Sequence, residues 1–196
     1  IEEVKGALRP WLDLKRMVRS ADNGERYFAS TGPASIVQVG NPELEPEKHH
    51  SAEIGTASQE AGWKGYGLAS PAGAWRVSAS LAHDHVQDFI TPDRARGQAG
   101  ILKSDGALIY RNVDVDLTTL SSDLQYVATP WMAARLNVTG ARGRNSSDHR
   151  ALYQVAPLEA NAYLDVFQGQ DSQLWNAGLR LRLVAPKRSV DDSLST

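Results

Sequence analysis

The chain has 196 residues, 41% of them hydrophobic, and a formal net charge of −2, which fits one domain or a section of a larger one. A charge so close to neutral argues against a protein that binds nucleic acid by electrostatic attraction. Cysteine is absent, which excludes disulfides, thiolate metal sites and cysteine nucleophiles. No stretch approaches about 18 consecutive apolar residues, so a membrane-spanning helix is excluded. A membrane β-barrel is not excluded, because its strands alternate between lipid-facing and lumen-facing residues.

The dominant periodicity along the chain is two, which predicts β-strands rather than helices. In chain order, we predict about seven strands, near residues 5–19, 48–58, 73–87, 108–128, 131–143, 155–167 and 173–186. The alternation is clearest in the last strand, where Leu179, Leu181 and Leu183 share one face and Arg180 and Arg182 share the other. The chain is therefore predicted to be all-β.

Charged residues occupy the middle of several predicted strands, opposite strongly apolar faces. They are Arg76, Arg135, Glu159, Asp165, Arg180 and Arg182. In a soluble β-sandwich such a face is solvated and the apolar face forms the core, whereas in a wide barrel it lines a wet lumen and the apolar face meets lipid. Alternation alone does not separate the two architectures, and the sandwich is the first expectation at this point only because it is the more common one.

The predicted connections differ in length at the two ends of the strands. Residues 128–130 and 169–172 form short turns, whereas the connections at the opposite end are long and polar, at 20–47, 88–107 and 144–154. Residues 59–72 are the exception, since this segment is longer than a tight turn. Long loops at one end and short turns at the other are typical of outer-membrane barrels.

Five segments resemble, in the same order, elements of the C-terminal barrel portion of TonB-dependent outer-membrane receptors. They are MVRSADNGERYF (17–28), GNPELEPEKHHSAEIG (40–55), WRVSASLAHDHVQDFI (75–90), IYRNVDVDLTTLSSDLQY (109–126) and ALYQVAPLEANAYLDV (151–166). The second is the most specific, because it resembles the family pattern G-N-P-x-L-x-P-E-x-x-x-x-x-E-x-G. Ala21 departs from the family, which usually has proline there. The stretch DRARGQAG (93–100), with Tyr110, Arg111 and Asn112 after it, resembles the copper-receptor branch.

The resemblance implies a barrel of about 22 strands that is filled by a plug. Nothing in residues 1–196 resembles the plug, the N-terminal strands, the last strands or a signal peptide, so we expect a partial β-barrel domain. The expected fold is an antiparallel up-and-down meander that forms an open curved sheet, part of a large transmembrane β-barrel.

The function implied by the resemblance is uptake of a scarce ligand, such as copper or a metal–siderophore complex, across the outer membrane of a Gram-negative bacterium. The expected partners are outer-membrane lipid, a metal or metal-chelate ligand, and the TonB complex through the missing plug. No nucleic acid and no cofactor are expected.

Two histidine pairs are candidate ligand contacts. His49 and His50 are adjacent, so on a strand they point to opposite faces and do not chelate one ion together, although either could supply one contact from a solvated loop. His83 and His85 share a face, with roughly 6.5–7 Å between them along a strand, and could hold a metal ion if a neighbour supplied a third ligand. The competing interpretation of His83 and His85 is a water-exposed rim.

Arg94, Arg96 and Lys103, in the long connection 88–107, are candidate contacts for an anionic metal chelate. No G-x-S-x-G or H-E-x-x-H motif occurs, and we expect no enzyme. The alternative to a receptor is a soluble β-sandwich binding module, which requires two sheets packed face to face.

Overall fold

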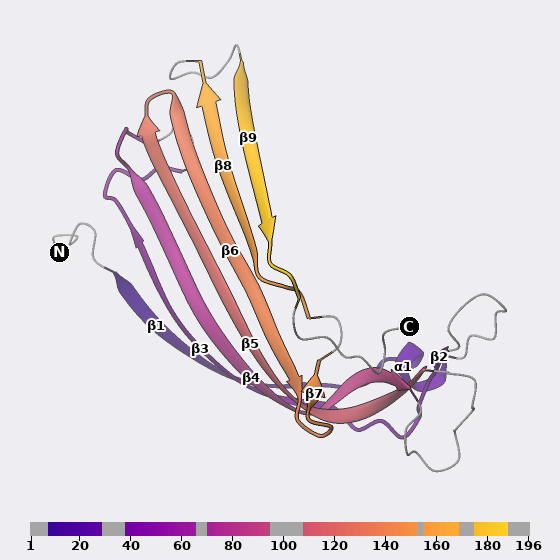
Figure 1. Ribbon diagram of the computed structural model, residues 1–196. Coiled ribbons are helices and arrows are strands. Elements are labelled where there is room, and N and C mark those ends of the chain that lie inside the picture. The colour runs from indigo at the N-terminus through magenta and orange to yellow at the C-terminus, as the bar shows by residue number, and fades with distance from the viewer. Residues whose placement is uncertain are drawn as a thin grey trace.

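The computed structural model describes residues 8–28, 38–65, 70–94, 108–152, 155–168 and 175–187. The long strands are β1 (Arg9–Arg19), β3 (Glu47–Gln59), β4 (Trp75–Arg94), β5 (Leu108–Thr129), β6 (Met132–Asn145), β8 (Glu159–Phe167) and β9 (Asn176–Val184) (Figure 1). The minor elements are β2 (Gln38–Val39), β7 (Arg150–Ala151) and the helix α1 (Asn23–Tyr27). No helix among these residues is long and apolar enough to cross a membrane.

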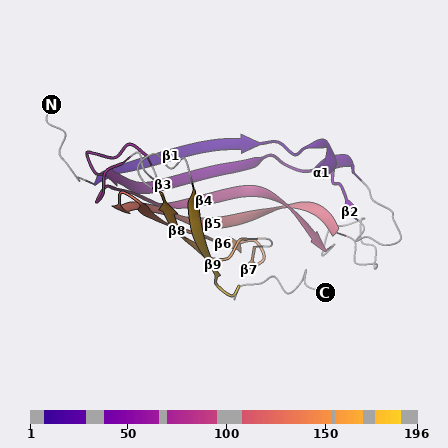
Figure 2. The same ribbon diagram turned by 90° about the horizontal axis from the view of Figure 1, so that it is seen from above.

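The long strands form one sheet in the order β1-β3-β4-β5-β6-β8-β9, and each pairs antiparallel with its neighbour. Each strand thus lies beside the long strand that precedes it in sequence, which confirms the predicted up-and-down meander. Figure 2 shows a single curved layer that runs from β1 to β9. The described residues contain no second sheet, so the β-sandwich alternative is wrong.

Three features depart from the predicted elements. β4 continues to Arg94, past the predicted end at 87, because a bulge between Val86 and Phe89 shifts the register and pairing with β5 then resumes. The two-residue strands β2 and β7 add to β5 and β6. The helix α1 was not predicted, although Asp22 and Glu25 form a capping box at its start, a local signal that the sequence carries.

Strand register separates the side chains into two faces. The apolar face contains the row Leu12, Ile54, Leu81 and Leu120 and the row Val77, Leu124, Leu136, Ala162 and Leu181. Ile54 is 59% exposed and Leu179, on the same face, is 70% exposed. So many exposed large apolar side chains on one face mark a surface that binds another protein or a membrane.

The opposite face, called the polar face here, contains the row Arg76, Gln125, Arg135, Tyr163 and Arg180 and the row Ser78, Asp123, Asn137, Asn161 and Arg182. A small buried cluster on this face contains Val86, Val113, Val115 and Leu152. It lies at the end of the strands where α1, β2 and β7 are also found (Figure 1). The long connections 20–46 and 146–158 leave the sheet at that end, and the short turn 130–131 lies at the other.

Candidate functional site

The polar face is organised by charge-assisted hydrogen bonds across neighbouring strands. Asp123 on β5 accepts a hydrogen bond from Arg135 Nε on β6 at 2.9 Å and from Gln125 Nε2 at 2.5 Å. Asn137 Nδ2 also donates to Asp123. These contacts hold a carboxylate and a guanidinium on the polar face without burying either of them, so this face stays hydrophilic.

A second network continues across β8 and β9. Arg182 donates to Glu159 Oε2 at 2.7 Å, and Asn161 donates to Glu159 Oε1 at 2.7 Å. Arg180 donates to Asn161 at 2.8 Å, and its guanidinium lies 5.2 Å from the centre of the Tyr163 ring. The polar face therefore holds positive and negative groups in fixed positions.

Glu47 is the centre of a third network, at the end of the sheet with the long connections. Its side chain is 2% exposed and accepts hydrogen bonds from Arg19 at 2.6 and 2.7 Å and from the backbone N–H of Ile90 at 2.8 Å. His49 lies between two carboxylates, with Nε2 at 3.2 Å from Glu47 and Nδ1 at 2.8 Å from Asp84. Both ring nitrogens therefore face acceptors, which favours the doubly protonated imidazolium.

Asp93 organises a fourth network, which links β4, β5 and β7. Its side chain is 3% exposed and lies 2.7 Å from Arg111 Nε, and Arg150 also pairs with it. Both arginines pair in addition with Asp148. The extension of β4 beyond its bulge is therefore fixed by ion pairs as well as by the strand ladder.

The predicted divergence of His49 and His50 is seen in the structure. His49 lies on the polar face, whereas His50 is in register with His85 on the apolar face. Both histidines belong to β3, which begins at Glu47, and not to the preceding loop. Sequence analysis did not identify Asp84 as a partner of His49, or Arg19 as the partner of Glu47, because these contacts depend on the pairing of β3 with β4 and with β1.

His83 and His85 share a face, as their spacing predicts. His85 Nδ1 lies 2.9 Å from Asp116 Oδ1, and His83 Nδ1 lies 3.2 Å from Thr118 Oγ1. Within the part of the chain that the structure describes, no group of three or more His, Asp or Glu side chains is placed to hold a metal ion. Metal binding by this pair stays a prediction.

The predicted loop contacts lie mostly beyond the described ranges. Arg94 is the last residue of β4 and is in register with Leu108. Arg96 and Lys103 lie outside the described residues. Their proposed contact with a chelate therefore stays a prediction.

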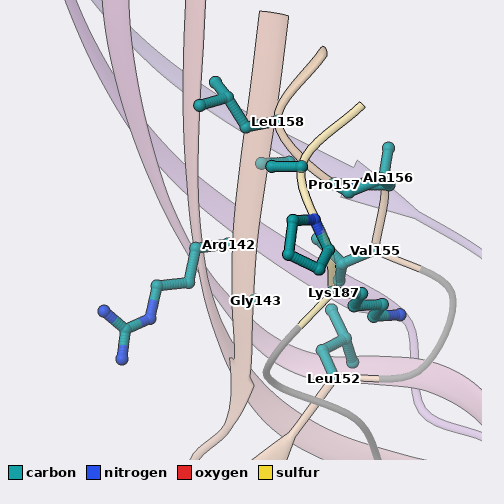
Figure 3. A pocket seen from close by; sticks show the side chains of 11 residues that line it. Arg142, Gly143, Leu152, Val155, Ala156, Pro157, Leu158 and Lys187 are labelled. Carbon is teal, nitrogen blue, oxygen red and sulfur yellow. The ribbon is translucent and has the colours of Figure 1, made fainter. Parts of the chain in front are cut away.

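A cavity of about 570 Å³ lies where β8 separates from β6 (Figure 3). Pairing of β6 with β8 ends at Thr139 and pairing with β7 begins at Arg144, so the edge of β6 is open between them. The lining is Ala141, Arg142, Gly143, Leu152, Val155, Ala156, Pro157, Leu158, Ala185, Pro186 and Lys187. A Cβ atom at Gly143 would come within 2.8 Å of Leu152 and Val155, so glycine permits this close approach.

A single curved antiparallel sheet with one apolar and one charged face defines a section of the wall of a membrane β-barrel. The family model described as "TonB dependent receptor-like, beta-barrel" matches residues 15–196, and the chain belongs to this family. Among solved structures, the chain is similar to one described as "Copper transporter OprC", with a TM-score of 0.72 and 26% sequence identity. The match covers 95% of this chain and 26% of the other, so the chain spans about a quarter of that protein. A search of curated proteins gave no match.

Proposed function

We propose that the chain is a section of the barrel wall of an outer-membrane TonB-dependent transporter in a Gram-negative bacterium. The observation that carries the proposal is the separation of faces across seven adjacent strands, which suits lipid on the Leu81 side and a wet lumen on the Arg135 side. A barrel must close to satisfy the edges of β1 and β9, so further strands are needed beside both. Coupling to the TonB complex is assigned to a plug outside this chain.

Copper is the cargo that we propose. Similarity to a copper transporter over 95% of this chain supports it. A second support is Met17 on β1, which is in register with His49 on β3 and lies on the polar face. Met17 is 55% exposed, and a thioether is a ligand that suits copper ions. The Met17 side chain would offer a passing copper ion a contact near the outer end of the lumen.

A metal–siderophore complex is the second candidate cargo. The polar face carries Arg76, Arg135, Arg180 and Arg182, and guanidinium groups suit anionic chelates. A copper transporter is needed when cells are starved of copper, whereas a transporter of an iron–siderophore complex is needed when they are starved of iron.

The test is deletion of the gene that encodes the complete receptor, followed by complementation. Cells are starved of copper or of iron, and cell-associated copper and iron are measured by mass spectrometry. Copper transport predicts that deletion lowers copper but leaves iron unchanged, and that complementation restores copper. Loss of iron alone would favour the siderophore complex, and loss of neither metal would contradict both proposals.

A further inference from the structure

On β4, β5 and β6 the apolar face ends in two polar rows, at the end of the sheet that carries the long connections. In register, the first row contains His83, Thr118 and Arg142 on these strands, and it continues through the apolar residues Ala52 on β3 and Leu14 on β1. The next row contains Arg16, His50, His85, Asp116 and Arg144 on β1, β3, β4, β5 and β6. We call these two rows the basic rows. They lie on the same face as Leu81 and Leu120, immediately beyond them.

The basic rows carry more cationic than anionic groups, because they hold three arginines and Asp116 is their single carboxylate. Their other polar side chains include three histidines. Asp116 is already engaged by His85 and Ser146. Asp88, farther along the face, is paired with Lys48 at 2.8 Å.

Arg142 and Arg144 are both exposed. No side-chain hydrogen bond or ion pair joins the guanidinium of either arginine to another described residue. In Figure 3 the Arg142 side chain extends away from the other labelled residues that line the cavity, so its guanidinium does not contact them. Two neighbouring rows thus each present an arginine whose donors are available to an anion.

The position of the basic rows matches a membrane interface. At the other end of the apolar face stand Trp75, Tyr126 and Trp175, aromatic residues of the type that marks one edge of the lipid layer. From Trp75 to His83 the strand rises roughly 26 Å, or roughly 20 Å across the membrane at a tilt of about 40°. The basic rows therefore stand where the opposite edge of an apolar band about 25 Å tall is expected. Because the long connections leave at this end, the edge faces the outer leaflet.

A shallow groove of about 210 Å³ joins the apolar face to the basic rows. It is lined by Leu81, Thr118, Leu120, Gly140, Arg142 and Leu158, with Ala141 beside them. The lining is mostly apolar, and Arg142 stands at its polar end. Such a groove fits a hydrocarbon chain whose anionic headgroup reaches the arginine.

We propose that the basic rows and this groove bind a phosphorylated lipid of the outer leaflet. One acyl chain lies between Leu120 and Leu158, and a headgroup phosphate is held by Arg142 and Arg144. Arginine suits this task because its planar fork donates two hydrogen bonds to one phosphate. The proposal rests on the proposed outer-membrane location but not on the cargo, since the site lies on the face opposite Met17 and His49.

The test uses the complete receptor, purified in detergent and analysed by native mass spectrometry with lipid A and with chemically dephosphorylated lipid A. The double variant Arg142→Gln/Arg144→Gln is expected to bind lipid A about tenfold or more weakly, because two charge-assisted contacts are lost. The unchanged receptor is expected to bind the dephosphorylated lipid as weakly as the variant does. A matched control, Arg76→Gln/Arg180→Gln, removes two charges from the polar face and is expected to bind lipid A normally.

Equal weakening in the control, or no weakening in the double variant, would overturn the proposal. Displacement of lipid A by inorganic phosphate at millimolar concentration would instead show a site for a free anion and would also overturn it. Folding is checked by the heat-dependent migration of the barrel on gels. If the glutamine variant does not fold, Arg142→Lys/Arg144→Lys keeps both charges but not the fork, and is expected to weaken binding by a smaller factor. Copper accumulation is also measured for the variants that are designed to weaken lipid A binding. Unchanged copper accumulation in these variants would separate failure of the lipid site from failure of the transport function.

Discussion

Arg19 on β1 forms a two-point ion pair with Glu47 on β3, and the nitrogen–oxygen distances are 2.6 and 2.7 Å. Glu47 is almost fully buried, and the same carboxylate accepts the backbone N–H of Ile90 on β4. One side chain therefore joins three strands at the end where the long connections leave the sheet.

The first prediction concerns this carboxylate. In the complete receptor, Glu47→Gln removes the charge that faces Arg19 and His49, and we expect a local loss of stability of about 1–3 kcal/mol. Hydrogen–deuterium exchange should become faster in the peptides that contain residues 47–51 and 88–91. The matched control is Glu43→Gln, at an exposed position, which should leave exchange unchanged. Unchanged exchange in Glu47→Gln would show that the network does not hold the strands together.

The second prediction concerns the contact between Trp11 and Gly55, which are opposite each other on β1 and β3. A Cβ atom at Gly55 would come within 2.3 Å of the Trp11 ring, so Gly55→Ala should destabilise the barrel by about 1–3 kcal/mol. In a Trp11→Ala background the same change should cost less, because the ring is gone. Denaturant unfolding of the four variants measures the coupling, and additive effects would contradict the contact.

The third prediction tests which face meets lipid. Leu81→Arg places a charge on the apolar face and should lower the stability of the folded barrel in lipid vesicles by about 2–4 kcal/mol. Ser80→Arg, one residue earlier on the polar face, is the matched control and should change the stability little. Equal effects of the two substitutions would show that the faces are not exposed to different environments.

The fourth prediction uses the two methionines of the chain. Met17 is in register with His49 on the polar face, whereas Met132 is in register with Val166 on the apolar face. If Met17 contacts copper in transit, Met17→Ala should lower copper accumulation several-fold in copper-starved cells, and Met132→Ala should not. The amount of receptor in the membrane is measured in parallel by immunoblotting. Equal accumulation at equal receptor amounts would remove Met17 from the pathway.

Most of the strands could be predicted because alternation is a local property. Each predicted strand overlaps a long strand of the sheet, and the faces of Arg180 and Leu179 follow from their neighbours alone. The extension of β4 could not be predicted in this way, because its bulge at Asp88, with a φ of 59°, interrupts the alternation. The cavity beside Gly143 was missed for a similar reason, since it depends on where β8 leaves β6.

By itself, the sequence determined that the chain is all-β, that its strands have one apolar and one charged face, and that His49 and His50 diverge. These properties depend only on the order of residues along one strand. The tertiary structure decided which residues from different strands meet, such as Arg19 with Glu47, 28 positions apart, and His50 beside His85. The physical reason is the hydrogen-bond register between strands, since a slip of one residue would move every side chain of a strand to the other face.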